Sequence, residues 1–204
     1  MAQRHAPATG RNRSYILEVL SDALPPEGTV LEIASGSGEH AVYFAPELIP
    51  RVWLPSDISA ENLASIDAWR AEFPSPNLRP AIHLDVTQAP WSVESTTPQP
   101  PITAIVNINM IHISPWECSE ALMAGAERIL PHDGVLFLYG PFKRGGRHTA
   151  PSNEAFDEQL KSQDSRWGVR DLETVLELAE SHGLVGNSIV DMPANNLSVV
   201  LQRR

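Results

Sequence analysis

Cysteine is almost absent from this sequence, which contains only Cys118 among its 204 residues. One thiol excludes an internal disulfide and any metal site built mainly from thiolates. No run of about 18 apolar residues occurs, so the sequence predicts no transmembrane helix. The first 13 residues also lack the apolar stretch of a secretory signal peptide. We therefore expect a cytoplasmic protein with no membrane partner.

Positive charge is also scarce. Lys and Arg total 15 against 25 Asp and Glu, which gives a formal net charge of −10. Bulk charge does not draw such a chain to a polyphosphate backbone, so we expect no nucleic-acid partner. Hydrophobic residues make up 42% and charged residues 20%, as in folded globular proteins. A chain of this length forms one domain, so any cofactor and substrate must share one sheet.

The N-terminal segment 1–13 has no acidic residue and carries Arg4, His5, Arg11 and Arg13. We predict a flexible arm here, and the alternative is a lid that orders over an anionic or zwitterionic ligand. Residues 14–204 are predicted to form the single domain.

Helix and strand patterns alternate through that domain. The sequence predicts helices at 14–24, 40–45, 59–73, 117–130, 153–163 and 171–182. It predicts strands at 29–34, 51–56, 79–84, 103–109, 135–139, 184–192 and 197–202. Such alternation is typical of an α/β fold with a parallel, doubly wound sheet and helices on both faces. The last two strands are separated by four residues, too few for a crossover, so they are predicted to be antiparallel.

Three successive strand ends carry residues suited to one ligand. After the first strand, Gly36 and Gly38 allow a tight turn and a close approach of the backbone to a ligand. Asp57 ends the second strand, where a carboxylate can accept hydrogen bonds from both hydroxyls of a ribose. Asp85 ends the third strand and can accept a hydrogen bond from an adenine amino group, with Val86 packed on the ring. The alternatives are a helix-capping role for Asp57 and a loop-capping role for Asp85.

This arrangement fits an adenosine-type ligand. NAD is one candidate, because Ala41 can take the last position of its usual glycine pattern. However, Glu32 lies just before the turn and does not help to bind a diphosphate, and the chain has no room for a separate substrate domain. A P-loop is excluded because no Gly-Lys-Ser/Thr follows the turn.

The segment Glu32-x-Ala34-x-Gly36-x-Gly38 resembles motif I of class I S-adenosylmethionine-dependent methyltransferases, with alanine in place of the first glycine. The resemblance implies a Rossmann-like sheet of seven strands, mostly parallel with a C-terminal antiparallel hairpin. It also implies S-adenosyl-L-methionine as the cofactor. The cofactor-binding residues it implies are Arg13, Glu32, Ala34, Ser35, Gly36, Ser37, Gly38, His40, Asp57, Ile58, Asp85, Val86 and Asn107.

The chain is more similar still to one branch of that family, the methyltransferase-like 26 proteins and their bacterial relatives of unassigned function. The likeness runs from residue 11 to the C-terminus and is carried by residues 11–13, 30–44, 108–116, 139–142, 148–153, 167–171 and 192–196. Because the branch has no settled substrate, the resemblance implies a fold and a cofactor but no acceptor.

The methyl acceptor is expected beside the ends of the fourth and fifth strands. His112 is a candidate general base because its ordinary pKa is near 6.5, and the alternative is a structural histidine stacked in a loop. Asn109 could orient the substrate or fix the loop, and Tyr139 completes the candidate catalytic set. The Asn/Asp-Pro-Pro-aromatic motif of many amine methyltransferases is absent.

A basic stretch at 143–147 stands out in this acidic chain and is predicted to hold a substrate carboxylate or phosphate, or else to be a solvated loop. The candidate substrate-binding residues are Trp116, Lys143, Arg144, Arg147, His148, Asn195 and Asn196. The seven histidines form no H-x-H or H-x-x-x-H pair, so no metal site is predicted. We expect methyl transfer to a small molecule. The alternatives are a non-catalytic module that binds S-adenosylmethionine or S-adenosylhomocysteine, and a nicotinamide-dependent oxidoreductase.

Overall fold

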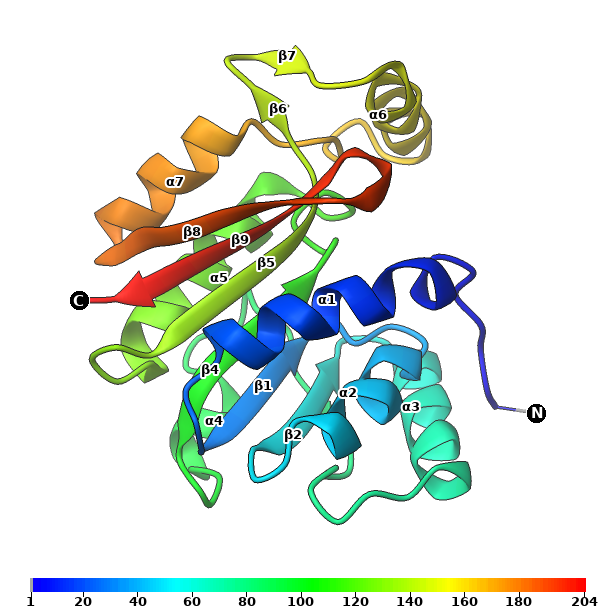
Figure 1. Ribbon diagram of the computed structural model, residues 1–204, viewed down its shortest axis with the longest axis vertical. Helices are drawn as coiled ribbons and strands as arrows, with labels where there is room; N and C mark the ends of the chain where they lie inside the picture. Colours follow the sequence, from blue (N-terminus) through cyan, green and yellow to red (C-terminus); the bar gives the residue numbers. More distant parts are fainter. Residues whose placement is uncertain (1) are drawn as a thin grey trace.

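The computed structural model describes residues 2–204 and has seven strands in one mixed sheet, in the order β3-β2-β1-β4-β5-β9-β8 (Figure 1). These strands are β1 (Thr29–Ile33), β2 (Val52–Asp57), β3 (Ile82–His83), β4 (Ile102–Ile108), β5 (Val135–Pro141), β8 (Leu184–Met192) and β9 (Asn196–Arg203). A separate two-stranded hairpin is formed by β6 (Lys143–Arg144) and β7 (Arg147–His148).

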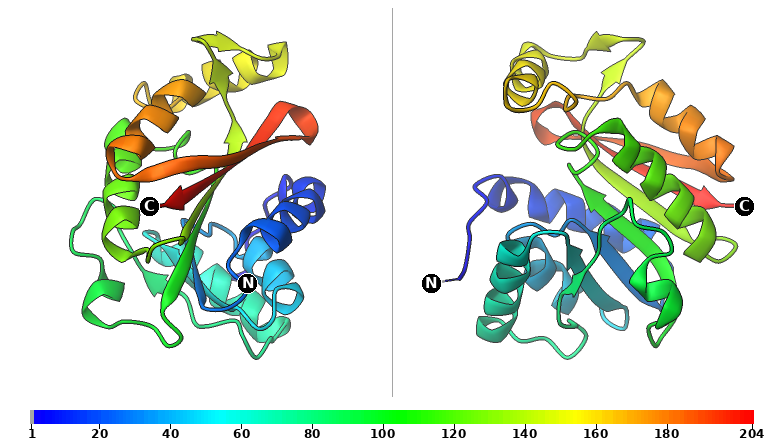
Figure 2. Two further views of the ribbon diagram at one scale, coloured as in Figure 1. Left: turned by 60° about the vertical axis from the view of Figure 1, so that its left-hand side comes forward. Right: turned by 180° about the vertical axis from the view of Figure 1, so that it is seen from behind.

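Helices cover both faces of the sheet, as Figure 2 shows. They are α1 (Thr9–Ala23), α2 (Glu39–Glu47), α3 (Ala60–Glu72), α4 (Ser92–Ser95), α5 (Trp116–Ile129), α6 (Pro151–Gln163) and α7 (Leu172–Ser181). On one face α1 and α2 pack on the sheet through a cluster that includes Phe44 and Trp53, and α3 lies beside α2. On the other face α4, α5 and α7 pack through a cluster that includes Trp91 and Leu122. The two clusters form the hydrophobic core.

The strand pairing confirms the expected fold class. Strands β1 to β5 pair in parallel, whereas β9 pairs antiparallel with both β5 and β8. The carboxyl ends of the parallel strands therefore share one edge of the sheet. The strand order reverses between β1 and β4, and folds of this kind bind ligands at such a switch point.

The structure adds α4, β6 and β7, which were not predicted, and two of the predicted elements differ most in their bounds because of local sequence. Helix α1 begins at Thr9 rather than at residue 14, and no side chain caps its N-terminus, so no capping residue signalled that start. Strand β3 has two residues instead of six. Pro80 lies where the longer strand was expected, and proline cannot donate a ladder hydrogen bond.

The N-terminal segment and the basic stretch also take definite positions. The Arg4 backbone N–H donates to Ser65 Oγ at 2.8 Å, and Trp69 Nε1 donates to the Arg4 carbonyl at 3.0 Å, so this segment lies along α3. The stretch at 143–147 forms the β6–β7 hairpin, whose turn residues Gly145 and Gly146 have positive φ. Within residues 2–204, no helix is long and apolar enough to cross a membrane.

Candidate functional site

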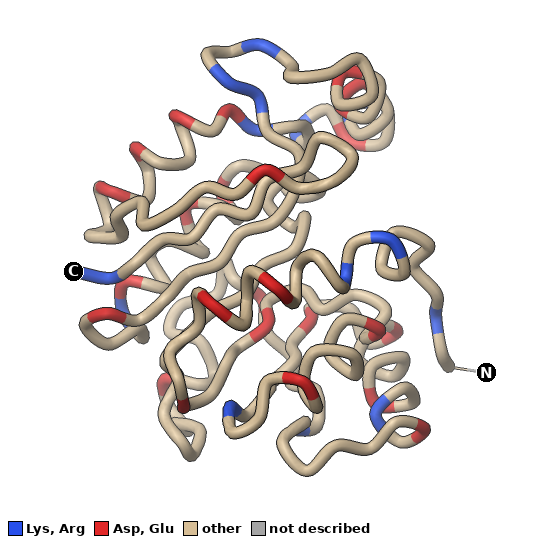
Figure 3. The backbone as a smooth tube through the Cα atoms, viewed as in Figure 1, with Lys and Arg blue, Asp and Glu red and all other residues tan. Residues whose placement is uncertain are grey.

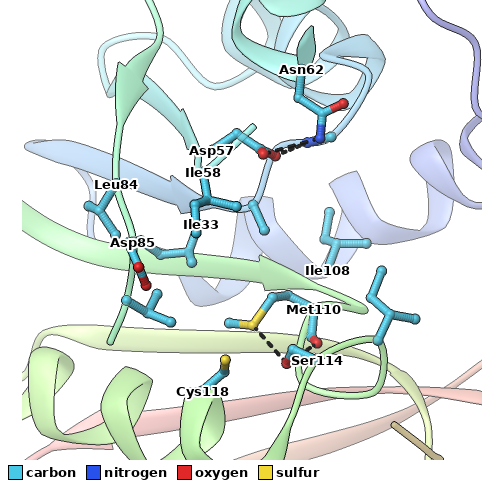
Figure 4. A pocket seen from close by; sticks show the side chains of 14 residues that line it. Ile33, Asp57, Ile58, Asn62, Leu84, Asp85, Ile108, Met110, Ser114 and Cys118 are labelled. Carbon is cyan, nitrogen blue, oxygen red and sulfur yellow. Dashed lines mark hydrogen bonds between the residues drawn. The ribbon is translucent and has the colours of Figure 1, made fainter. Parts of the chain in front are cut away.

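A cavity of about 280 Å³ lies at the carboxyl edge of the sheet, where β1 to β4 end (Figure 4). Asp57 and Asp85 border it on the side of β2 and β3, and the loop that follows β4 borders it on the other side. The lining residues are Ile33, Ala34, Gly36, Asp57, Ile58, Asn62, Leu84, Asp85, Val86, Ile108, Met110, Ile113, Ser114 and Cys118. The structure thus brings together six of the residues expected to bind a cofactor, namely Ala34, Gly36, Asp57, Ile58, Asp85 and Val86.

The turn after β1 contains two glycines with different surroundings. Gly36 has φ +59°, and a Cβ added there would meet no atom within 4 Å. Gly38 has φ +93°, and its added Cβ would lie 2.7 Å from the Cα of Ile66 in α3. Gly36 therefore keeps space open beside the cavity, whereas Gly38 allows α3 to pack against the turn. Ala34, at the position of the first motif glycine, also has a left-handed backbone, with φ +58°.

Asp57 is 3% exposed and is held by hydrogen bonds to both carboxylate oxygens. Its Oδ2 accepts from the Gly36 N–H at 2.9 Å, and its Oδ1 accepts from the Ser59 N–H at 2.9 Å and from Asn62 Nδ2 at 3.1 Å. Asp57 therefore contacts the first turn of α3, which Ser59 caps, and it borders the cavity at the same time. The cap of α3 is Ser59, so Asp57 supports the capping residue and also lies at the cavity.

An N-terminal residue fixes the amide of Asn62. Arg4 Nη1 donates to Asn62 Oδ1 at 3.0 Å. Because a guanidinium only donates, this contact turns the Asn62 Nδ2 group toward Asp57. Arg4 thus orients a side chain that lines the cavity, although Arg4 itself does not line it.

Asp85 follows β3 and combines loop capping with a place at the cavity. Its Oδ1 accepts from the Thr87 N–H at 2.9 Å and from Thr87 Oγ1 at 2.7 Å. Within residues 2–204, Oδ2 accepts no hydrogen bond, so it is free to accept one from a ligand.

The end of β4 and the loop after it present apolar side chains to the cavity, chiefly Ile108 from the strand and Met110 and Ile113 from the loop. Ser114 Oγ donates to the Met110 carbonyl at 2.7 Å, which occupies its hydroxyl proton. Burial raises the pKa of Cys118, so its thiol stays protonated at neutral pH. Sequence reasoning missed these residues and Asn62, because an alternating apolar pattern does not distinguish a cavity wall from the core.

His112 does not face the cavity. It is fully buried, and its Nδ1 accepts from the Arg170 N–H at 3.3 Å, so the neutral ring carries its proton on Nε2. That Nε2 has no hydrogen-bond partner among residues 2–204. Burial lowers the pKa of His112 to about 3. This geometry is that of the structural alternative and opposes a role as general base, because the nitrogen that carries the lone pair, Nδ1, already accepts a hydrogen bond within the protein.

The other two candidate catalytic residues also lie outside the cavity lining. Asn109 has φ +66°, and its N–H donates to the Tyr139 carbonyl at 2.8 Å, which fixes the start of the loop. Tyr139 is 3% exposed, and burial raises the pKa of its hydroxyl.

Several residues expected to bind the cofactor do not line the cavity and instead make contacts within the protein. Burial raises the pKa of Glu32 to about 7, and its carboxylate accepts from Trp53 Nε1 at 2.9 Å within the core. His40 Nε2 lies 3.0 Å from Asn12 Oδ1, and burial lowers the pKa of His40 to about 4. Gly38 and the remaining residues of this group, Arg13, Ser35, Ser37 and Asn107, do not line the cavity either.

These remaining residues contact the protein itself. Ser35 Oγ accepts from the Ser56 N–H at 3.2 Å, and Ser37 Oγ donates to Glu39 at 3.0 Å. Asn107 Nδ2 donates to the Ile33 carbonyl at 3.1 Å, while its buried Oδ1 has no partner among residues 2–204. The guanidinium of Arg13 lies 4.3 Å from the centre of the Tyr43 ring.

The candidate substrate-binding residues lie outside the cavity, and most are held by intramolecular contacts. Lys143 and His148 both lie 3.2 Å from the buried carboxylate of Asp157, and Arg144 lies 3.7 Å from Asp191. Arg147 is exposed.

Three further candidates are placed by their neighbours. Trp116 is the first residue of α5, which was predicted to begin at residue 117, and the centre of its ring lies 5.6 Å from the guanidinium of Arg170. The Asn195 carbonyl accepts from Asn153 Nδ2 at 2.9 Å, and Asn196 Nδ2 donates to the Pro193 carbonyl at 3.1 Å.

Comparison with protein-family models matches residues 3–203 to a family described as "Protein of unknown function (DUF938)". The match covers almost the whole chain.

Solved structures share the fold at low sequence identity. One is CalO1, a methyltransferase in calicheamicin biosynthesis in its SAH-bound form, with a TM-score of 0.71 and 17% identity over 94% of this chain and 54% of that one. Human N-acetylserotonin methyltransferase in complex with SAM gives 0.76 and 12%, over 96% of this chain and 52% of that one. Geranyl diphosphate methyltransferase with GPP and sinefungin gives 0.72 and 14%, over 94% and 77%. The chain spans about half the length of the first two proteins, and these likenesses establish a methyltransferase fold.

Proposed function

The chain belongs to the DUF938 family of proteins of unknown function, and we propose that it transfers a methyl group from S-adenosylmethionine to a small molecule. The main observation behind this proposal is that Gly36 and Asp57 lie side by side at the cavity. A backbone N–H bonds a carboxylate there at 2.9 Å, and the space that a side chain at Gly36 would fill is free of protein atoms. The methyltransferase fold supports the same cofactor.

The cavity residues fit the parts of this cofactor. Asp57 would accept hydrogen bonds from the ribose hydroxyls, and Asp85 Oδ2 would accept one from the adenine amino group. Ile58 and Val86 would pack against the adenine ring. The cofactor supplies an electrophilic methyl group on a sulfonium, and its amino-acid portion would approach the turn after β1.

The acceptor side requires little acid–base chemistry from the protein. Among the described residues that line the cavity, the end near β4 has no basic side chain. We therefore propose that this loop acts by excluding water and holding the acceptor in line with the methyl group, a contribution of proximity and orientation. Within the methyltransferases, we further propose kinship with the methyltransferase-like 26 branch, on the sequence strings described above.

Calorimetric titration with S-adenosylhomocysteine tests the cofactor assignment. Wild-type protein should bind, and Asp57→Asn should raise Kd at least tenfold, because a hydrogen bond to a charged group contributes about 1.5–3 kcal/mol. Asp67→Asn is the matched control, since Asp67 lies on α3 with its side chain 47% exposed and paired with Arg70. No binding by the wild type, or equal binding by Asp57→Asn, would contradict the proposal.

Methyl transfer itself needs a separate readout. Incubation with a metabolite extract and cofactor labelled in its methyl group should yield a labelled product. If S-adenosylhomocysteine binds but no component of the extract becomes labelled, the protein is a binding module instead.

A further inference from the structure

The two ends of the cavity differ in charge. Among the described lining residues, Asp57 and Asp85 are the charged side chains, and both lie at the end assigned above to adenosine. The end near β4 is formed by Ile108, Met110 and Ile113. The polar side chains there carry no charge: the Ser114 hydroxyl donates to the Met110 carbonyl, and the thiol of Cys118 stays protonated because burial and, to a smaller extent, the nearby Asp85 carboxylate raise its pKa.

The basic hairpin next to this region does not supply a free cation to the cavity. Figure 3 shows Lys and Arg gathered on β6–β7 with acidic residues on the neighbouring helices. Asp157, with a side chain 4% exposed, contacts Lys143 and His148 at 3.2 Å and Lys161 at 2.7 Å. Lys143 and His148 are therefore held by Asp157, and no residue of the hairpin is among the described residues that line the cavity.

A second cationic side chain, that of Arg170, donates hydrogen bonds to backbone carbonyls of the loop after β4. Its Nε donates to the Ile111 carbonyl at 2.8 Å, and one of its terminal nitrogens donates to the Ser114 carbonyl at 2.6 Å. The two histidines near these strand ends add no charge, since burial lowers the pKa of His40 to about 4 and that of His112 to about 3. No Lys or Arg is among the described residues that line the cavity, so a carboxylate or phosphate entering this end would find no cationic lining residue there.

Apolar side chains stand open at the mouth of the cavity. Ile58 is 59% exposed and Ile113 is 41% exposed, although both are large aliphatic residues that gain free energy on burial, about 25 cal/mol per Å². They lie on opposite sides, after β2 and in the loop after β4. A ligand that covers Ile113 gains most if its own surface is apolar.

The lining near β4 carries no charge, Lys143 and Arg170 are bonded within the protein, and two isoleucines are exposed at the opening of the cavity. From these observations we infer that the methyl acceptor is an uncharged, largely apolar small molecule that packs against Ile108, Met110 and Ile113. This inference rests on the proposed function. In the transfer, a lone pair on a heteroatom of the acceptor forms the new bond to the methyl carbon. The carbon–sulfur bond breaks with its electron pair on sulfur, and a proton on the heteroatom, where present, leaves to water.

A pair of probes of the same shape and different charge tests the inference. In the presence of saturating S-adenosylhomocysteine, 2-naphthol should bind with a Kd at least tenfold below that of 2-naphthoate at pH 7. Equal or tighter binding of the naphthoate, or no binding of the naphthol, would overturn the inference while leaving the proposed function intact. Failure of S-adenosylhomocysteine itself to bind would overturn both.

A charge placed at the mouth should change this preference. Ile113→Lys should reduce the preference for naphthol over naphthoate at least tenfold, because the new ammonium pairs with the carboxylate. Ile189→Lys is the matched control, since Ile189 is also 41% exposed but lies on β8, away from the cavity. Both side chains are at the surface, and an unchanged melting temperature would verify folding. An unchanged preference in Ile113→Lys would place the acceptor elsewhere and contradict the inference.

Discussion

The turn after β1 and the loop after β4 follow neighbouring parallel strands and border the same cavity, yet they are built differently. The β1 turn, residues 34–38, is shaped by backbone conformation, with positive φ at Ala34, Gly36 and Gly38. The β4 loop, residues 109–114, has a positive φ at Asn109 alone and is otherwise shaped by side chains: its His112 is buried, and its Met110 and Ile113 face the cavity.

The two regions are therefore suited to bind different parts of the reaction at one edge of the sheet. The β1 turn and the carboxylates beside it offer hydrogen bonds and charge, which suit the polar cofactor proposed above. The β4 loop offers an uncharged surface, which suits an acceptor recognised by shape. Changes to glycine or alanine should therefore affect the first region through backbone conformation, and changes to His112 should affect the second through burial.

The largest expected effect separates the two glycines of the turn. Gly38→Ala should reduce the free energy of unfolding by about 3 kcal/mol, because its Cβ would press on the backbone of Ile66 and alanine is strained at positive φ. Gly36→Ala should cost only the strain, about 1–2 kcal/mol, but should weaken binding of S-adenosylhomocysteine. Chemical denaturation and calorimetry measure the two quantities. Similar losses of stability in both variants would mean that the glycines serve the same purpose.

The second prediction concerns the pH dependence of stability. The folded pKa of His112 is about 3, below its ordinary value, so on acidification the unfolded chain takes up a proton that the folded chain refuses. Between pH 7 and pH 5 this site should cost about 2 kcal/mol of stability, and His112→Asn should remove that loss. Two other groups also make stability depend on pH in this range. On acidification the lowered pKa of His40 costs stability, whereas the raised pKa of Glu32 adds stability. The quantity to compare is therefore the difference in stability between the variant and the wild type at each pH.

The control for this measurement is His132→Asn, at a side chain that is 77% exposed. Its imidazole lies 2.9 Å from the exposed carboxylate of Asp133, and an exposed ion pair contributes only about 0–1 kcal/mol, so the loss of stability between pH 7 and pH 5 should stay close to that of the wild type. If His112→Asn follows the wild-type profile as well, His112 is not the buried neutral group described here.

The smallest expected effect is a gain. Ala34 adopts φ +58°, which costs an L-residue about 1–2 kcal/mol, while glycine costs about 0.5–1 kcal/mol in chain entropy. Ala34→Gly should therefore stabilise the protein by about 0.5 kcal/mol. Ala194→Gly provides a comparison at φ +57° in the turn between β8 and β9, and thermal unfolding should show a similar gain there. A loss of stability in Ala34→Gly would mean that its methyl group makes contacts that outweigh the strain.

Much of the fold could be predicted because its signals are local. Short apolar runs located the strands, and the four residues between the last two required an antiparallel pair. The start of α1 at Thr9 could not be read, because no capping side chain precedes it. The shortening of β3 depends on how its neighbours pair, although Pro80 was a visible warning.

The residues of the candidate site also fall into two groups, those that local sequence signals could predict and those that depend on contacts distant in the sequence. Gly36, Asp57 and Asp85 lie at strand ends, and parallel pairing necessarily brings such ends to one edge. The burial of His112 depends on Arg170, which is 58 residues away along the chain, and the neutralisation of Lys143 depends on Asp157 in a later helix. Neither contact leaves a local pattern, so residue type alone suggested a base and an anion site that the structure does not bring to the cavity.

The central claim is that the carboxylates after β2 and β3 hold the adenosine part of S-adenosylmethionine. A crystal structure of the complex with S-adenosylhomocysteine tests it most directly. The account predicts the ribose hydroxyls on Asp57, the adenine amino group on Asp85, and the thioether sulfur directed toward Ile108 and Met110. A ligand bound away from Asp57 and Asp85 would contradict it.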